Sequence, residues 1–175
     1  MSEEKEYVFK VIVVGDERVG KTSIIMRYTE NRFPVSYKPS LGSDIAIKVI
    51  TIKGLRVKLA IWDIAGHQVF ERIRRYYYTG AAGAIVMYDI TNPRSFENVE
   101  KWCGDVREHC GNIPCILVGN KIDLKDERKV TTDMGKSLAE KLKFNAFIES
   151  SAKTGENVHE VFQRLTREML KSPRA

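Results

Sequence analysis

The sequence predicts a single three-layer α/β domain, in which a six-stranded, mostly parallel sheet with one antiparallel edge strand is flanked by about five helices. Three observations support this prediction. Short apolar runs typical of buried strands alternate with stretches of helical length. Most intervals between these runs are long enough for parallel crossovers. A two-residue turn, Lys53-Gly54, indicates a hairpin between the second and third runs.

The expected elements follow from these patterns in chain order. The strands are predicted over residues 7–14, 45–52, 57–62, 84–88, 115–118 and 146–148, and the helices over residues 21–28, 70–78, 95–109, 132–142 and 158–170. The turn Thr91-Asn92-Pro93 introduces the third helix, and Gly111 after it is typical of a left-handed helix end. Because ligands of such sheets bind beyond the carboxyl ends of the strands, we expect the functional residues in the loops there.

The composition is that of an ordinary folded domain. With 175 residues, of which 43% are hydrophobic, the chain can bury a core without disulfides or metals. Three cysteines without C-x-x-C spacing are typical of reduced thiols in an intracellular protein. The net charge of +6 includes no run of five like charges, so it does not indicate nucleic-acid binding.

The two ends of the chain are expected to lie outside the folded core. Residues 1–6 are acidic and are expected to form a short flexible N-terminus, and residues 171–175 are expected to begin a C-terminal tail without a prenylation cysteine. No stretch reaches the ~20 apolar residues needed to cross a bilayer. We therefore expect a cytoplasmic, monomeric protein, peripheral on membranes if a longer tail or a partner attaches it.

The loop after the first predicted strand reads Gly-Asp-Glu-Arg-Val-Gly-Lys-Thr, a complete G-x-x-x-x-G-K-[ST] phosphate loop. Its glycines let successive backbone N–H groups wrap a polyphosphate, while Lys21 neutralises phosphate charge and Thr22 offers Mg²⁺ a hydroxyl. The following helix points its N-terminus at the anion. The expected phosphate-binding residues are Gly15, Asp16, Glu17, Arg18, Val19, Gly20, Lys21, Thr22 and Ser23.

A second motif, Asp63-Ile64-Ala65-Gly66, follows the third predicted strand. A carboxylate at this position can reach a Mg²⁺ ion held by Thr22, and the Gly66 amide can contact a terminal phosphate. Asp-x-x-Gly alone is common in plain turns. Its coincidence with the phosphate loop favours the functional interpretation.

Two further motifs follow the last two strands, Asn120-Lys121-Ile122-Asp123 and Ser151-Ala152-Lys153. A carboxylate such as Asp123 can accept hydrogen bonds from N1–H and the N2 amine of guanine, which adenine cannot supply. The Ala152 amide would donate to guanine O6, and the Lys121 stem can lie along the base. The alternative is a helix cap at Asp123 and an ordinary loop serine. The expected base-binding residues are Asn120, Lys121, Asp123, Ser151, Ala152 and Lys153.

From about residue 9 to residue 170 the chain resembles the Ras-like small GTPases, and the Rab branch in particular. The motifs described above and a first switch occur in the family's order, and Trp62, the run Tyr77-Tyr78-Thr79-Gly80-Ala81 and the run Tyr88-Asp89-Ile90-Thr91 resemble Rab signatures. The resemblance implies a P-loop G domain that binds GTP and GDP with Mg²⁺ and hydrolyses GTP. It also implies a Rab-like role in vesicle trafficking or signalling, with effectors, exchange factors and GTPase-activating proteins at the two switch regions.

The resemblance assigns further residues by position. Phe33 corresponds to the aromatic residue that packs on the base, Tyr37 to the one that closes over the phosphates, and Ser40 to the switch hydroxyl on Mg²⁺. The implied metal ligands are therefore Thr22, Ser40 and Asp63. Because the family usually has threonine at position 40, serine keeps the coordinating oxygen but loses the methyl group that restricts its rotamer.

The chain departs from the family at the residue after Gly66. The family usually has glutamine there, which orients the attacking water. In this chain the residue is His67, and its ring carries donor and acceptor on opposite edges, so it cannot copy the amide geometry. Some translational GTPases use histidine at the matching place. Impaired hydrolysis and a working histidine mechanism are therefore both open, with His67, Lys21, Gly66 and Ser40 as the expected catalytic residues.

A second departure lies inside the phosphate loop. Glu17 and Arg18 stand where Ras itself has two glycines. A carboxylate about 5 Å from the terminal phosphate would be repelled by roughly 3 kcal/mol at an effective dielectric near 20, so we expect Glu17 to point to solvent. Arg18 could instead act as a built-in charge stabiliser. Two functional hypotheses follow: a slowly hydrolysing switch, or a pseudo-GTPase scaffold that holds nucleotide with little turnover.

Overall fold

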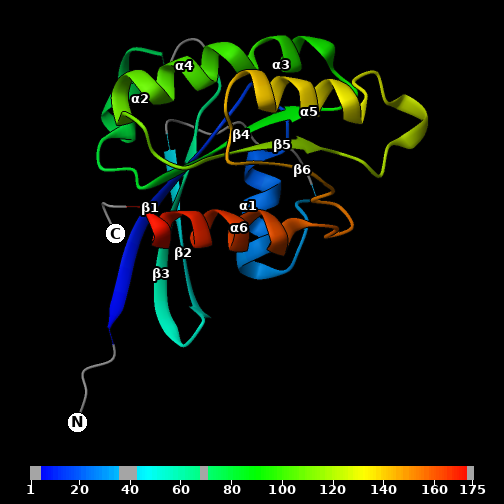
Figure 1. The fold of residues 1–175 in the computed structure, drawn as a ribbon. Coiled ribbons are helices and arrows are strands. Elements are labelled where there is room, and N and C mark those ends of the chain that lie inside the picture. The colour runs from blue at the N-terminus through cyan, green and yellow to red at the C-terminus, as the bar shows by residue number, and fades with distance from the viewer. Residues whose placement is uncertain (1–4, 36–42, 68–70, 173–175) are drawn as a thin grey trace.

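The computed structural model describes residues 5–35, 43–67 and 71–172 and shows an α/β domain (Figure 1). Its elements, in chain order, are β1 Glu6–Val14, α1 Lys21–Glu30, β2 Ser43–Ile52, β3 Leu55–Ile64, α2 Glu71–Tyr78, β4 Gly83–Asp89, α3 Pro93–Glu97, α4 Val99–Cys110, β5 Cys115–Asn120, the 3₁₀ turn η2 Lys125–Glu127, α5 Thr132–Lys141, β6 Ala146–Ser150 and α6 Val158–Lys171.

The six strands form one sheet in the order β2-β3-β1-β4-β5-β6. Strands β1 and β3 to β6 are mutually parallel, and the edge strand β2 pairs antiparallel with β3. The β2–β3 turn has positive φ at both central residues, 50° at Lys53 and 75° at Gly54. This backbone twist suits a tight hairpin. The predicted mostly parallel sheet with one antiparallel edge is therefore confirmed.

Helices cover both faces of the sheet, which gives the predicted three layers (Figure 1). Because side chains alternate along a strand, neighbouring residues of β1 enter different cores. Val11 and Val13 pack in the core shared with α1 and α6, whereas Ile12 and Val14 pack in the core shared with α2, α4 and α5. The central strand β4 is buried along its whole length, as expected for a strand covered on both faces.

The single helix expected over residues 95–109 is instead divided into α3 and α4, which meet at Asn98. The Asn92 side chain caps α3 by accepting the Arg94 N–H, and Pro93 occupies the first helical position. Asn98 ends α3 and begins α4, and its side chain leaves the helix to bond Asp16. If α3 and α4 are taken as one broken helix, the helices of the described residues number the expected five.

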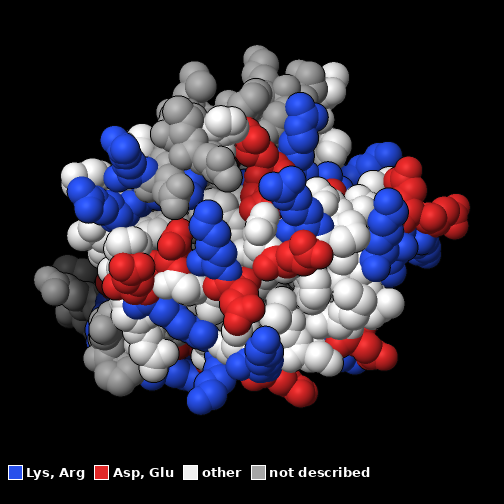
Figure 2. Space-filling model, turned by 90° about the horizontal axis from the view of Figure 1, so that it is seen from above, with Lys and Arg blue, Asp and Glu red and all other residues white. Residues whose placement is uncertain are grey.

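The surface carries charges of both signs. In the face shown in Figure 2, basic and acidic side chains are interspersed rather than gathered by sign. Within residues 5–35, 43–67 and 71–172, no helix has the length and apolar character needed to cross a bilayer.

The core between the sheet and α6 includes a stacked ring pair, Tyr28 of α1 and Phe162 of α6, with centroids 4.1 Å apart. Phe162 is fully buried. We expect Phe162→Ala to lower the free energy of unfolding by about 3–5 kcal/mol, because the lost ring leaves a cavity between the two helices. Urea denaturation at fixed nucleotide concentration measures this change. The matched control is Gln163→Ala, an exposed neighbour on the same helix, which should change stability by less than about 0.5 kcal/mol.

Candidate functional site

A cavity of about 840 Å³ opens at the carboxyl edge of the sheet. It is lined by residues of the phosphate loop, of the segment after α1, of the segment after β3 and of the loops after β5 and β6. The predicted site residues in its lining are Glu17, Arg18, Gly20, Lys21, Thr22, Ser23, Phe33, Gly66, His67, Asn120, Lys121, Asp123, Ala152 and Lys153. The lining also includes Met26, Pro34, Val35, Asp44 and Leu124, which the motifs did not indicate.

The remaining predicted residues stand behind this lining or outside the described chain. Gly15, Asp16, Val19 and Ser151 belong to the same loops and Asp63 to the end of β3, and none of these five lines the cavity. Tyr37 and Ser40 lie outside the described residues.

The phosphate loop is held in shape by conformations that glycine favours and by close packing. Gly15 and Gly20 have φ of 148° and 103°. A Cβ atom on Gly20 would overlap the Asn120 side chain, and one on Gly15 would overlap the Met87 carbonyl group. Arg18 also has positive φ, 66°, which is uncommon for a residue with a side chain. The loop therefore needs its two glycines for steric reasons.

Asn120, at the end of β5, joins three loops from a buried position. Its Nδ2 donates to the Val19 carbonyl at 3.0 Å, and its Oδ1 accepts from Ser150 Oγ at 3.1 Å and from the Ala152 amide at 3.2 Å. With 2% of its surface exposed, Asn120 is hydrogen-bonded on both ends of its amide. The loops expected to hold phosphates and base are thus bonded to each other.

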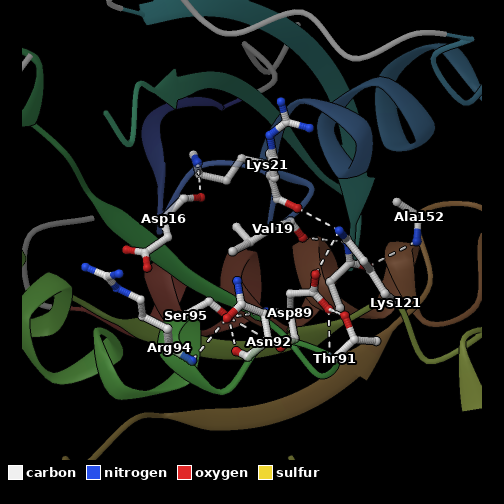
Figure 3. A network of polar contacts seen from close by, with 12 residues as sticks. Asp16, Val19, Lys21, Asp89, Thr91, Asn92, Arg94, Ser95, Lys121 and Ala152 are labelled. Carbon is white, nitrogen blue, oxygen red and sulfur yellow. Dashed lines mark hydrogen bonds and ion pairs between the residues drawn. The ribbon is translucent and has the colours of Figure 1, made fainter. Parts of the chain in front are cut away.

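Lys121 makes a second link between these loops (Figure 3). Its Nζ donates to the Arg18 carbonyl at 2.7 Å and pairs with Asp89 Oδ2 at 2.8 Å. Asp89 is oriented in turn by the amide and hydroxyl of Thr91, which donate to Oδ1 at 2.8 and 2.7 Å. Lys121 therefore lines the cavity with its ammonium held by two partners, the Arg18 carbonyl and Asp89.

Asp123 is held by the last motif of the chain. Ser151 Oγ donates to Asp123 Oδ1 at 2.7 Å, which ties the loop after β5 to the loop after β6. Arg27 of α1 fixes that second loop from behind, since its Nε and Nη2 donate to the carbonyls of Ala152 and Lys153 at 2.9 and 2.7 Å. Sequence reasoning did not single out Arg27, because its role depends on carbonyl groups that no motif reveals.

Lys21 is a buried cation in the cavity wall. It is 7% exposed, and its Nζ donates to the Asp16 carbonyl at 2.8 Å (Figure 3). Burial lowers the pKa of Lys21 to about 8, although the charges of Asp63, Asp16 and Glu17 oppose this shift. A phosphate in the cavity would counteract this shift, because an anion near the ammonium favours its charged form.

Thr22 and Asp63 bring two hard oxygen ligands together beside Lys21. Thr22 Oγ1 donates to Asp63 Oδ2 at 2.5 Å, although the two residues lie in α1 and β3. Asp63 is 3% exposed. A hydroxyl and a carboxylate fit Mg²⁺, which prefers oxygen ligands and is usually held by one or two protein groups together with substrate phosphates. The described part of the expected metal site thus has the right chemistry.

The carboxylate of Asp16 faces away from the cavity and toward α4. It accepts hydrogen bonds from Asn98 Nδ2 at 2.6 Å and from Trp102 Nε1 at 2.8 Å. Trp102 is a buried residue of α4. A buried indole N–H needs a hydrogen-bond acceptor, and for Trp102 this acceptor is the Asp16 carboxylate.

Gly66 lies directly on the phosphate loop. A Cβ atom at this position would stand 2.5 Å from the Gly15 carbonyl oxygen and 2.8 Å from the Glu17 amide nitrogen. His67 is exposed and lines the cavity, as do the exposed residues Glu17 and Arg18. The three departures from the family pattern therefore border one cavity.

The comparisons with known proteins agree with this geometry. A family model described as Ras family matches residues 10–171. GTP-binding protein ypt2 of Schizosaccharomyces pombe is 41% identical over 167 residues, which cover 95% of this chain and 83% of the relative. Ras-related protein RABA2a of Arabidopsis thaliana is 42% identical over 168 residues, covering 95% of this chain and 77% of the relative.

Human Ras-related protein Rab-8B is 37% identical over 171 residues, which cover 97% of this chain and 82% of that protein. These likenesses extend over nearly the whole chain, in agreement with the order of its motifs. The chain therefore belongs to the Ras family of small GTPases and stands closest to its Rab branch.

Proposed function

We propose that this protein is a guanine-nucleotide switch that binds GTP and GDP with Mg²⁺ and hydrolyses GTP slowly. The observation that carries the proposal is one cavity bordered by the phosphate loop, Gly66, His67 and the two base-binding motifs. The phosphates would lie against the loop amides, Lys21 and the N-terminus of α1. The base would lie between Lys121 and Phe33, with its edge toward Asp123 and the Ala152 amide.

The metal would be held by Thr22 and Asp63, with Ser40 as the switch ligand that the family resemblance implies. Bound Mg²⁺ neutralises charge that develops on the phosphates. Lys21 supplies a second positive charge from a buried position, where it acts more strongly than in water. The Gly66 amide would contact the terminal phosphate and so make the structure around it depend on whether GTP or GDP is bound.

A Rab-like role in trafficking is supported by the names of the relatives and by one surface cluster. Trp62 of β3 and Tyr77 of α2 lie with ring centroids 6.1 Å apart. Ile45 of β2 pairs in register with Trp62 and is 52% exposed. The cluster lies next to the segments that would respond to the nucleotide, so partners can read its state there. At position 45, where the Rab branch that this chain resembles usually has phenylalanine, this chain has the smaller, aliphatic isoleucine.

Slow hydrolysis is proposed from His67 and Glu17. Imidazole cannot donate and accept toward one side as an amide does, so a water beside His67 is held less well. Glu17 adds a negative charge close enough to favour the charged form of Lys21. A carboxylate there also opposes the negative charge of a terminal phosphate.

The alternative is a pseudo-GTPase scaffold that binds nucleotide and hardly turns it over. The same residues, His67 and Glu17, favour it. The two functions differ in one observable, because the scaffold would release no phosphate within the lifetime of its complex, whereas the switch would release it in a single exponential phase.

The guanine preference tests the proposal as a whole. Calorimetry with Mg²⁺ should show tight binding of GDP and GTP and no comparable binding of ADP or ATP. Asp123→Asn should weaken GDP binding by about a hundredfold, because the amide turns a donor toward the donors of guanine and leaves them unpaired. Asp126→Asn, an exposed residue in η2, is the matched control and should bind like the wild type. Equal affinity for ADP and GDP in the wild type would contradict the proposal.

The pKa of Lys21 makes nucleotide affinity depend on pH. Phosphate binds the ammonium form, and the pKa of about 8 means that the ligand-free protein loses this proton as the pH rises through 8. Binding must then take up a proton, so the affinity for Mg²⁺–GDP should fall by up to about tenfold between pH 8 and pH 9 and change little, through this group, below pH 7.

Calorimetry in buffers of different ionisation enthalpy measures this proton uptake directly. Lys21→Arg is the control, because its guanidinium stays protonated throughout this range and its affinity should lack the decline, whatever its absolute value. A wild-type affinity that stays level up to pH 9, with no proton uptake, would show that Lys21 is fully charged before the nucleotide binds.

His67→Gln tests the cause of slow hydrolysis. The amide restores a donor and an acceptor that can share one water, so single-turnover phosphate release from Mg²⁺–GTP should accelerate by at least about tenfold. His159→Gln, an exposed residue on α6, should leave the rate unchanged. A wild-type rate equal to or above that of His67→Gln would favour a working histidine mechanism, and no release from either protein would favour the scaffold.

A further inference from the structure

Arg74 is a buried cation on a helix whose other arginines face solvent. It is 3% exposed, whereas Arg72 and Arg75 of the same helix α2 are exposed. Burial of a guanidinium is costly unless hydrogen bonds and packing compensate for the lost water. An arginine that only made α2 soluble would face water, so the burial of Arg74 needs another explanation.

The guanidinium of Arg74 holds the backbone on both sides of Gly66. Its Nη1 donates to the His67 carbonyl at 3.0 Å and lies 3.4 Å from the Ala65 carbonyl oxygen, a longer and weaker contact. The guanidinium carbon also lies 4.6 Å from the centre of the Trp102 ring. One side chain thus joins the segment after β3 to α4.

Trp102 extends this connection to the phosphate loop. Its indole N–H donates to Asp16, whose carboxylate also accepts from Asn98. Arg74 therefore rests on a residue that is fixed to the phosphate loop, and not only on its own helix. Its positive charge also lies close enough to Lys21 to lower the pKa of that ammonium, which places Arg74 near the phosphate end of the cavity.

The contact of the Ala65 carbonyl with Arg74 also determines the direction in which the Gly66 N–H points. In a trans peptide the C=O of one residue and the N–H of the next point to opposite sides. Because the Ala65 carbonyl faces Arg74, the Gly66 N–H faces the other way, and Gly66 itself lines the cavity and lies against Gly15 and Glu17. The His67 carbonyl, held by the same nitrogen, fixes the chain one residue further on.

We propose that Arg74 is a positioning residue for the terminal phosphate: by holding the carbonyls of Ala65 and His67, it orients the Gly66 amide toward the cavity and so sets the preference for GTP over GDP. The inference rests on the proposed function, because it assigns a role within the same nucleotide site. A planar guanidinium can stack on the Trp102 ring while its Nη1 donates toward both carbonyls, whereas an ammonium has no flat face to stack.

The test compares the affinities of GTPγS and GDP, both with Mg²⁺, in the wild type and in two variants. Arg74→Met removes the donors and keeps much of the packing volume, whereas Arg74→Lys keeps the charge and loses the planar fork. We expect both variants to lower the ratio of GTPγS to GDP affinity by about tenfold, since a charge-assisted hydrogen bond is lost. GDP affinity itself should change by less than about threefold, because GDP does not reach the terminal-phosphate position.

Two further variants separate positioning from general stability. Arg75→Met, on the same helix, removes an exposed arginine that donates to Tyr76 and should leave the ratio unchanged. In Gly66→Ala, the added Cβ would collide with the Gly15 carbonyl and prevent the close approach of this segment. If Arg74 acts through Gly66, Arg74→Met should have almost no further effect in the Gly66→Ala background.

Each outcome bears on the inference separately from the proposed function. A ratio unchanged in Arg74→Met overturns the inference, and so does a full GTPγS preference in Arg74→Lys, which would mean that the charge alone acts. Equal losses of GTPγS and GDP affinity would show a purely structural role and overturn it as well. Failure of the wild type to bind either nucleotide would instead overturn the proposed function.

Discussion

The buried side-chain amide of Asn120 is the interaction on which the site depends. Four loops converge at the carboxyl edge of the sheet, and the strands alone do not fix the positions of these loops relative to one another. By donating to Val19 and accepting from Ser150 and Ala152, this one amide sets the phosphate loop against the loop expected to bind the base. Gly20 is required beside it, since any side chain there would occupy the place of the amide. Lys121 repeats the connection one residue later, through the Arg18 carbonyl.

The two sides of the cavity differ in the interactions that form them. On the side expected to hold the base, Asp123 is oriented by a hydrogen bond from Ser151, and Arg27 fixes the loop behind it. The side expected to hold the phosphates carries a buried charge, the ammonium of Lys21, which is 7% exposed. We expect the hydrogen bonds to give selectivity on the first side and the buried charge of Lys21 to give affinity for phosphate on the second. Two of the departures from the family, Glu17 and His67, lie next to Gly66, on the second side.

Sequence reasoning reached most of the fold and the residues of the cavity, because these depend on local patterns. Lys53-Gly54 specified a hairpin by its own backbone preferences, and the glycine-rich loop specified its shape by sterics. It missed contacts made between distant segments. The hydrogen bond from Trp102 to Asp16 and the packing of Arg74 on the Trp102 ring join residues far apart in the chain, and no period or spacing of the sequence predicts them. The break at Asn98 was missed for the same reason, since its side chain bonds a loop that the helix pattern does not include.

The size of the cavity has a consequence for the whole molecule. About 840 Å³ of space lies between loops that come from both halves of the sheet, so a ligand there completes contacts that the chain cannot make with itself. A ligand that binds only the folded form stabilises it by mass action, by about 4 kcal/mol when its concentration is a thousand times its dissociation constant. That is comparable with the entire stability of a small domain. We therefore expect bound nucleotide to protect this chain against unfolding and proteolysis.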